Sequence, residues 1–312
     1  MILCGRNQET GTGTARTADH RMTYSKDRFQ ITRGLSFLII GLIYVIASAA
    51  GILIYRGLSY HFALNLLIAD AAATFLVFVF SVVLRNSSVY DPYWSVAPVV
   101  IVTYASCVNV MDPVRALMLA AVCIWGVRLT ANWAYTFGGL AYQDWRYTKL
   151  EGDTGKFYPL INLLGIHMFP TMVVYGCILP AVFVFRYDVP FGPFNVLGFA
   201  VSVCAAVLQG TADIQMHRYR LHRDTSFIRT GLWKWSRHPN YLGEILMWWG
   251  VGISAVSSMP DRPYLLAGAL INMLMFLVVS IPLADGRQSQ KPGFEEYKAE
   301  TRMLLPLPMH SS

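Results

Sequence analysis

Eight long apolar segments constrain this chain more than any other feature of its sequence. A helix needs roughly 20 apolar residues to cross the hydrocarbon core of a membrane. Segments close to that length cover residues 34–55, 62–84, 94–111, 114–137, 158–185, 194–215, 240–258 and 263–283. Only 14% of the 312 residues are charged and 55% are hydrophobic, too few charges for the surface of a soluble protein. The sequence therefore predicts an all-α polytopic integral membrane protein with about eight transmembrane helices, or seven if the short segment 94–111 does not cross.

The chain is predicted to form one transmembrane domain preceded by a tail. Residues 1–33 are polar and lack apolar periodicity, which predicts a disordered N-terminal tail. The domain covers 34–308, and the first apolar run is too long for a cleaved signal peptide. The fifth apolar segment contains Pro170 and Pro180, so we expect its helix to be kinked or broken.

The basic residues predict the orientation of the domain. If the tail, alternate loops and the C-terminus lie on one side, that side holds 20 Lys and Arg residues. The other side holds four, at Arg56, Arg115, Arg186 and Arg262, and Arg128 lies inside a helix. Because loops rich in Lys and Arg stay in the cytosol, both termini are predicted to be cytosolic.

The overall charge of +7 fits topology and attraction to anionic lipid headgroups, and does not indicate nucleic-acid binding. The five cysteines show no CxxC pair and no Cys/His metal spacing, so neither a disulfide framework nor a metal site is expected.

One loop has more basic residues than the positive-inside rule requires. Residues 217–237 contain six Lys or Arg and one acid, which suits a dinucleotide phosphate, although topogenesis alone remains the alternative.

Ionisable side chains at membrane depth are costly and are candidates for function. Asp70, Asp213 and Glu244 lie in or beside apolar segments, and Arg128 is a natural partner for one of them. A buried structural ion pair is the alternative interpretation. His167 is interpreted as a packing histidine.

The densest polar cluster is residues 236–244 (SRHPNYLGE). A proline at 239 is suited to the first turn of a helix, which would place Asn240 and Glu244 on one face. An arginine beside a helix N-terminus suits phosphate binding. Gln209, Asp213 and Arg220 share a helix face upstream, so one cleft could contain both groups.

A second polar cluster is residues 90–95 (YDPYWS). A tyrosine beside a carboxylate can donate a proton to a substrate. A membrane-interface turn with aromatic anchors is the alternative.

Residues 231–244 (GLWKWSRHPNYLGE) and the ending 294–297 (FEEY), with Thr301, Leu305 and Pro306, resemble the signature of the steroid 5-alpha-reductase-like superfamily. That superfamily also includes sterol carbon-14 reductases and isoprenylcysteine carboxyl methyltransferases. Residues 90–95, 125–129 and 144–147 are similar to an uncharacterised bacterial-type branch, and the resemblance covers about 65–308.

The resemblance implies NADPH as cofactor, bound on the cytosolic side by the half at about 195–308. The residues that it implies for cofactor binding are Gln209, Asp213, Arg220, Arg237, His238, Asn240, Tyr241, Glu244, Arg287 and Tyr297. Arg287 lies in the segment 284–290 (ADGRQSQ), where steroid reductases carry His and Tyr. The catalytic Glu and Tyr of those enzymes are matched most nearly by Asp70 and Tyr93, with Asp91 as a second carboxylate beside the tyrosine.

The leading hypothesis is an enzyme, an NADPH-dependent reductase that transfers a hydride to an activated carbon–carbon double bond of a small steroid- or isoprenoid-like lipid. The family resemblance favours a bacterial inner membrane. The alternatives are an S-adenosylmethionine-dependent methyltransferase of the same superfamily and a non-catalytic lipid-binding protein. Against the methyltransferase, the only Glu-Glu pair, 295–296, lies within the closing motif itself.

Overall fold

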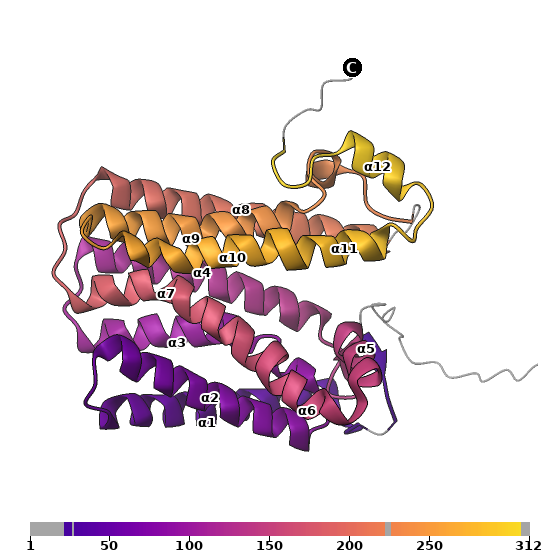
Figure 1. Ribbon diagram of the computed structural model, residues 1–312, viewed down its shortest axis with the longest axis horizontal. Coiled ribbons are helices and arrows are strands. Elements are labelled where there is room, and N and C mark those ends of the chain that lie inside the picture. Colours follow the sequence, from indigo (N-terminus) through magenta and orange to yellow (C-terminus); the bar gives the residue numbers. More distant parts are fainter. Residues whose placement is uncertain (1–21, 27, 222–225, 307–312) are drawn as a thin grey trace, which may run out of the picture.

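The computed structural model describes residues 22–26, 28–221 and 226–306, and long helices dominate this part of the chain (Figure 1). The long helices are α1 (Arg33–Gly57), α2 (Phe62–Val83), α3 (Tyr93–Val108), α4 (Pro113–Thr136), α7 (Phe169–Arg186), α8 (Pro193–Leu221) and α9 (Pro239–Ser258). The shorter α-helices are α5 (Trp145–Thr154), α6 (Tyr158–Ile161), α10 (Ala267–Met275), α11 (Ile281–Gln288) and α12 (Phe294–Glu300). Short 3-10 turns are η1 (Ser87–Tyr90), η2 (Gly155–Phe157), η4 (Gly231–Lys234) and η5 (Pro263–Leu266), and π-helical turns are η3 (Asn162–Met168) and η6 (Phe276–Ser280).

Each of the eight predicted apolar segments coincides with a helix. Within the described residues, six helical stretches are long and apolar enough to cross a membrane: Arg33–Gly57, Phe62–Val83, Pro113–Thr136, Trp145–Arg186, Pro193–Leu221 and Pro263–Gln288. The remaining two are α3, which has 16 residues, and α9, which has polar residues in its first two turns. The chain is therefore an all-helical protein with the helices of a polytopic membrane protein.

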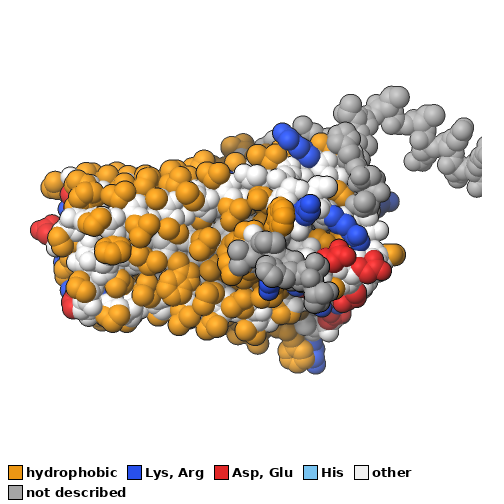
Figure 2. Space-filling view, turned by 90° about the horizontal axis from the view of Figure 1, so that it is seen from above, with side chains coloured by type: hydrophobic (Ala, Val, Ile, Leu, Met, Phe, Trp, Pro, Cys, Tyr) orange, Lys and Arg blue, Asp and Glu red, His pale blue; other side chains and the backbone are white. Residues whose placement is uncertain are grey.

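The connections between helices alternate between the two ends of the bundle. Short connections at 58–61, 109–112, 187–192 and 259–262 lie together at the left of Figure 1, which we call the short-loop end. The opposite end, which we call the polar end, contains α5, α12 and the starts of α1, α3 and α9. Figure 2 shows hydrophobic side chains along the visible flank and most of the visible Lys and Arg at the polar end. In the described part of the chain, the helical stretches thus run between the two ends of the bundle.

Part of the predicted disordered tail is ordered. Residues Met22–Tyr24 form strand β1, which pairs antiparallel with β2 (Tyr142–Asp144). Arg33 then donates from Nε to the carbonyl of Phe137, at 2.7 Å, and so caps the C-terminus of α4. Residues 22–24 of the expected tail thus form a strand, and three residues are too few to show an alternating pattern in the sequence. Residues 1–21 lie outside the described part.

The fifth apolar segment is not a regular helix. The π-helical turn η3 ends one residue before Phe169-Pro170, and α7 continues through Pro180. Proline lacks the N–H that an α-helix needs and its ring crowds the preceding turn, so the chain widens locally to a π turn. The stretch from α6 through α7 crosses the bundle obliquely (Figure 1). The break expected in the fifth apolar segment is therefore the π turn before Pro170.

Candidate functional site

A buried carboxylate joins three helices near the polar end. Glu244, in the second turn of α9, is 4% exposed. Its Oε1 accepts from Trp248 Nε1 at 2.9 Å, and its Oε2 accepts from Trp125 Nε1 at 2.8 Å and from Gln209 Nε2 at 2.7 Å. Three N–H donors therefore satisfy this carboxylate inside an apolar bundle, where an unpaired charge would be costly.

Arg128 extends this arrangement toward α8. Its Nη1 lies 3.0 Å from Asp213 Oδ2, and its Nη2 donates to Gln209 Oε1 at 2.6 Å. The prediction that Arg128 pairs with one of the buried acids is confirmed, and the acid is Asp213. Gln209 and Asp213 reach the same arginine because they lie one helical turn apart. We call Asp213, Arg128, Gln209 and Glu244 the α8–α9 network.

Asp285 organises the start of α9. Its two oxygens lie 3.1 Å from Arg237 Nη2 and 2.8 Å from His238 Nε2, and the ring of Tyr241 stacks on His238 with 5.2 Å between centroids. The Arg237 side chain also donates to the carbonyls of Lys298 and Thr301. These contacts fasten the closing segment of the chain to α9.

The sequence interpretation missed Asp285. Its only signal was an acid two residues before Arg287, in the segment where the chain departs from steroid reductases. The structure gives it two basic partners that are far away in the sequence.

Tyr297 and Arg287 tie together the elements of the polar end. The Tyr297 hydroxyl donates to the carbonyl of Trp233, and burial raises the pKa of Tyr297 to about 12. The guanidinium of Arg287 lies 4.1 Å from the ring centroid of Trp145, the first residue of α5.

Two further predicted site residues are half-buried: Arg220, in the last turn of α8, and Asn240, in the first turn of α9. Residues 222–225 of the basic loop lie outside the described part.

A second polar group lies among α2, α3 and α7. The side chains of Asp70 and Tyr93 are 8% and 4% exposed, and the Tyr93 hydroxyl lies beside the Asp70 carboxylate and the Thr74 hydroxyl. Thr74 Oγ1 is 3.1 Å from Thr171 Oγ1, which is 2.8 Å from the Tyr90 hydroxyl. We call Asp70, Tyr93, Thr74, Thr171 and Tyr90 the hydroxyl cluster.

Asp91 has a different partner. The Tyr147 hydroxyl of α5 donates to Asp91 Oδ1 at 2.7 Å. Burial, with a smaller contribution from Asp144, raises the pKa of Asp91 to about 7. The sequence left either Asp70 or Asp91 as the carboxylate that orients Tyr93, and the structure places Asp70 beside it.

Three tryptophans form a row of contacting rings that includes two partners of Glu244. Trp94, next to Tyr93 in the chain, has its ring centroid 6.1 Å from that of Trp125, which is 4.8 Å from that of Trp248. Trp125 and Trp248 are the residues that hold Glu244. The three rings thus connect the α8–α9 network with α3, the helix that carries Tyr93.

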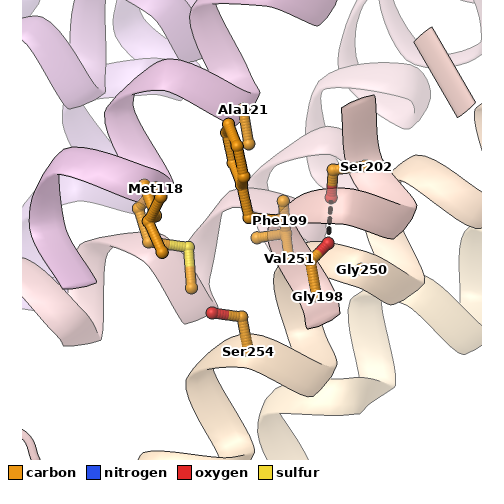
Figure 3. Close-up of a pocket in the computed structure, with 9 residues that line it drawn as sticks. Met118, Ala121, Gly198, Phe199, Ser202, Gly250, Val251 and Ser254 are labelled. Atoms are coloured by element: carbon orange, nitrogen blue, oxygen red, sulfur yellow. Dashed lines mark hydrogen bonds between the residues drawn. The ribbon is translucent and has the colours of Figure 1, made fainter. Parts of the chain in front are cut away.

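A small pocket lies elsewhere in the bundle, between α4, α8 and α9 (Figure 3). It is lined by Met118, Ala121, Phe199, Ser202 and neighbouring small residues. The Ser202 hydroxyl is already bonded to the carbonyls of Gly198 and Met247. This pocket contains none of the predicted site residues and no group suited to catalysis. In the described part of the chain, no group of His, Cys, Asp and Glu side chains could hold a metal ion.

Comparison with known proteins connects the chain to a family without an assigned activity. The family model described as "Protein of unknown function (DUF1295)" matches residues 77–301, well over half of the chain. An uncharacterised protein of Schizosaccharomyces pombe is 27% identical over 197 residues, covering 54% of this chain and 57% of the relative. The chain thus matches little more than half the length of this relative. No solved structure matches the chain.

Proposed function

The chain belongs to the DUF1295 family of proteins of unknown function, and we propose that it is an NADPH-dependent membrane reductase acting on a lipid. The substrate would be a steroid- or isoprenoid-like molecule with a double bond conjugated to a carbonyl. The observation that carries the proposal is that the side chains of Tyr93 and Asp70 lie beside each other. Both are buried among the apolar helices. The likeness to steroid 5-alpha-reductases, carried by residues 231–244 and 294–297, supplies the class of reaction.

NADPH would supply the hydride that adds to the double bond. As the hydride adds, electrons move to the carbonyl oxygen, which becomes negatively charged. Tyr93 donates a hydrogen bond to that oxygen and then its proton, and the resulting enol tautomerises to the saturated ketone. Asp70, in its protonated form, donates to the phenolic oxygen, so that the single phenolic proton is left for the substrate. An apolar surrounding strengthens both interactions because no water competes for them.

The residues of the polar end fit a dinucleotide. Arg220, Asn240 and Arg287 are half-buried there. Asn240 lies at the N-terminus of α9, where backbone N–H groups suit phosphate, and Arg220 and Arg287, at the C-terminal ends of α8 and α11, supply guanidinium groups. In this proposal the α8–α9 network and Asn240 would hold the nicotinamide end of the cofactor. Arg237, His238, Tyr241 and Tyr297 shape the site by holding the closing segment against α9.

We place this site on the cytosolic side of a bacterial inner membrane, with eight transmembrane helices and both termini in the cytosol. The support is the 20-to-4 distribution of Lys and Arg and the alternation of the connections between the two ends. A cytosolic polar end gives access to NADPH, and the helices give the lipid access from the bilayer.

Ligand-induced thermal stabilisation tests the cofactor. The detergent-purified protein is heated with NADPH, NADH or S-adenosylmethionine, and a ligand at about 100 times its dissociation constant adds roughly 2.7 kcal/mol. We expect NADPH to stabilise the protein and the effect to be lost in Asn240→Ala and Arg220→Ala. Arg56→Ala, at the exposed end of α1 on the short-loop side, is the matched control and should respond like the wild type. Stabilisation by S-adenosylmethionine alone would instead indicate methyl transfer, and no response would favour a non-catalytic role.

Replacement of Tyr93 by Phe tests the proton donor. Removing a general acid lowers turnover by roughly 100- to 10,000-fold, so Tyr93→Phe should abolish measurable oxidation of NADPH with steroid or isoprenoid enones. Stabilisation by NADPH should be unchanged. Tyr104→Phe, on the same helix, is the control, and equal turnover in wild type and Tyr93→Phe removes Tyr93 from the mechanism.

A further inference from the structure

We infer that Thr74, Thr171 and Tyr90 form a proton path that connects Tyr93 and Asp70 with His167, nearer to the polar end. The use of the path in catalysis rests on the proposed reductase function. The path itself is a property of the folded protein and can be measured without substrate or cofactor.

The path is a row of hydroxyl groups from several elements. It begins where the Tyr93 hydroxyl meets Asp70 and Thr74. It continues from α2 to α7 through the 3.1 Å contact between Thr74 and Thr171, and then to Tyr90 of η1 at 2.8 Å. Thr74, Thr171 and Tyr90 are at most 3% exposed, so the row is enclosed by protein. Isolated buried hydroxyls would each need only one partner, whereas here each is connected to the next.

His167 marks the end of the row toward the polar end. It precedes Thr171 by four residues, lies in the π turn η3, and its ring centroid is 4.7 Å from that of Tyr90. Its side chain is fully buried, and its Nδ1 lies 3.0 Å from the Asn162 carbonyl. Among the described residues, its Nε2 has no hydrogen-bonding partner. Buried polar atoms normally bond to protein or to an internal water molecule, and π turns are frequent at functional sites.

A row of hydroxyls can move a proton because each hydroxyl both donates and accepts. When the Tyr93 O–H bond breaks and its proton passes to the substrate oxygen, the phenolate takes a proton from Thr74. Thr74 takes one from Thr171, and Thr171 takes one from Tyr90. Tyr90 takes one from a water molecule that we place beside the unpartnered Nε2 of His167. One proton enters for each proton that leaves, and every hydroxyl is restored without any oxidant or reductant.

The proposed reaction removes the proton of Tyr93, and this path returns one to it. Tyr93 lies among helices whose outer surfaces are apolar, so the bilayer cannot restore its proton after turnover. A connection through the protein to the polar end restores it from the aqueous side.

Hydrogen–deuterium exchange of the Asp70 carboxyl tests the path. Detergent-purified protein is acidified until an infrared carboxylic-acid band appears that is missing in Asp70→Asn, and the exchange of that band in D₂O is followed. We expect Thr171→Val to slow the exchange by roughly tenfold or more, because the shape is kept while the hydroxyl bridge is lost. Thr171→Ser keeps the hydroxyl and should exchange at nearly the wild-type rate, and Thr74→Val should behave like Thr171→Val. Thr103→Val, which changes an exposed threonine on α3, should have no effect.

Equal exchange rates in wild type, Thr171→Val and Thr74→Val would overturn the path, whatever the protein does with NADPH. Slow exchange in the Val variants without stabilisation by NADPH would support the path and reject the reductase. The two proposals therefore fail independently.

Discussion

At the scale of single residues, two buried carboxylates are satisfied in different ways. Glu244 accepts three N–H groups from Trp125, Trp248 and Gln209, so both of its oxygens are hydrogen-bonded within the protein. Asp70 lies beside a hydroxyl group that can also face a substrate. In the proposed reaction, Glu244 holds Trp125 and Trp248 in place, and Asp70 acts beside Tyr93.

The role of Glu244 predicts a loss of stability in Glu244→Gln. The new amide N–H₂ group replaces an acceptor, so at least one N–H donor of the site faces another donor. Leaving a buried donor unpaired costs about 1–3 kcal/mol. We expect a melting temperature several degrees lower in detergent. Glu300→Gln, on the exposed side of α12, is the control, and an equal melting temperature for both variants would contradict this role.

The raised pKa of Asp91 predicts that the stability of the protein depends on pH. Its pKa is raised to about 7 in the folded protein, against about 3.9 in an unfolded chain. Between these values the folded state holds a proton that the unfolded state has lost, so the free energy of unfolding falls as pH rises through this window. Because Asp91 is only half-buried, we expect an effect of about 1–2 kcal/mol.

The measurement is the melting temperature between about pH 5 and about pH 8. Asp91→Asn should remove part of the decline with rising pH, and Asp261→Asn, exposed at the short-loop end, should not. A decline that is as steep in Asp91→Asn as in the wild type would show that other groups cause it.

At the scale of elements, α8 and α9 pack more closely than ordinary side chains allow. A Cβ on Gly250 would lie 2.3 Å from Ser202 Oγ and 2.5 Å from the Gly198 carbonyl oxygen. Small residues let the two backbones approach in this way, as in other membrane helix pairs. The close approach brings Gln209 within reach of Glu244 and so makes the α8–α9 network possible.

This packing predicts opposite effects for two Gly→Ala substitutions. Gly250→Ala forces the helices apart and should destabilise the protein by about 1–3 kcal/mol. Gly41→Ala, on α1, meets no atom within 4 Å and should be neutral or slightly stabilising. Thermal unfolding of both variants in one detergent gives the comparison, and equal melting temperatures would show that α8 and α9 can separate at no cost.

At the scale of the whole molecule, the polar end collects most of the predicted site residues and the basic loops. Eight passes through the bundle bring the starts of α1 and α9 and the end of α11 to this end (Figure 1). The short-loop end is closed by other contacts. Arg115, buried at the start of α4, is bonded to Asp188 at 2.9 Å and to the Val184 and Tyr187 carbonyls.

The proposed orientation predicts the behaviour of fusion proteins. In a bacterial host, green fluorescent protein at the C-terminus should fluoresce, and alkaline phosphatase at that position should be inactive. Alkaline phosphatase fused after Pro190, at the short-loop end, should be active, because that end faces away from the cytosol. Active phosphatase at the C-terminus would reverse the orientation.

Much of the site could be predicted from residues that are close together in the chain. The one-face spacing of Gln209 with Asp213, and of Asn240 with Glu244, follows from helical periodicity. The cost of a buried charge predicted that Arg128 pairs with one of the acids, and the structure identified Asp213. The role of Asp285 could not be predicted, because its partners Arg237 and His238 lie 48 and 47 residues away. The pairing of β1 with β2 could not be predicted either, because it joins two three-residue segments that are far apart in the sequence.

The sequence by itself determined the class of the protein and the positions of its helices, because the hydrocarbon core accepts only long apolar segments with internally bonded backbone. The tertiary structure alone decided which polar groups meet. It paired Tyr93 with Asp70 rather than with its chain neighbour Asp91, and it extended that pair to Thr171 of α7. These contacts depend on how helices cross and how closely they pack, which is set by small residues and side-chain shape far from the site.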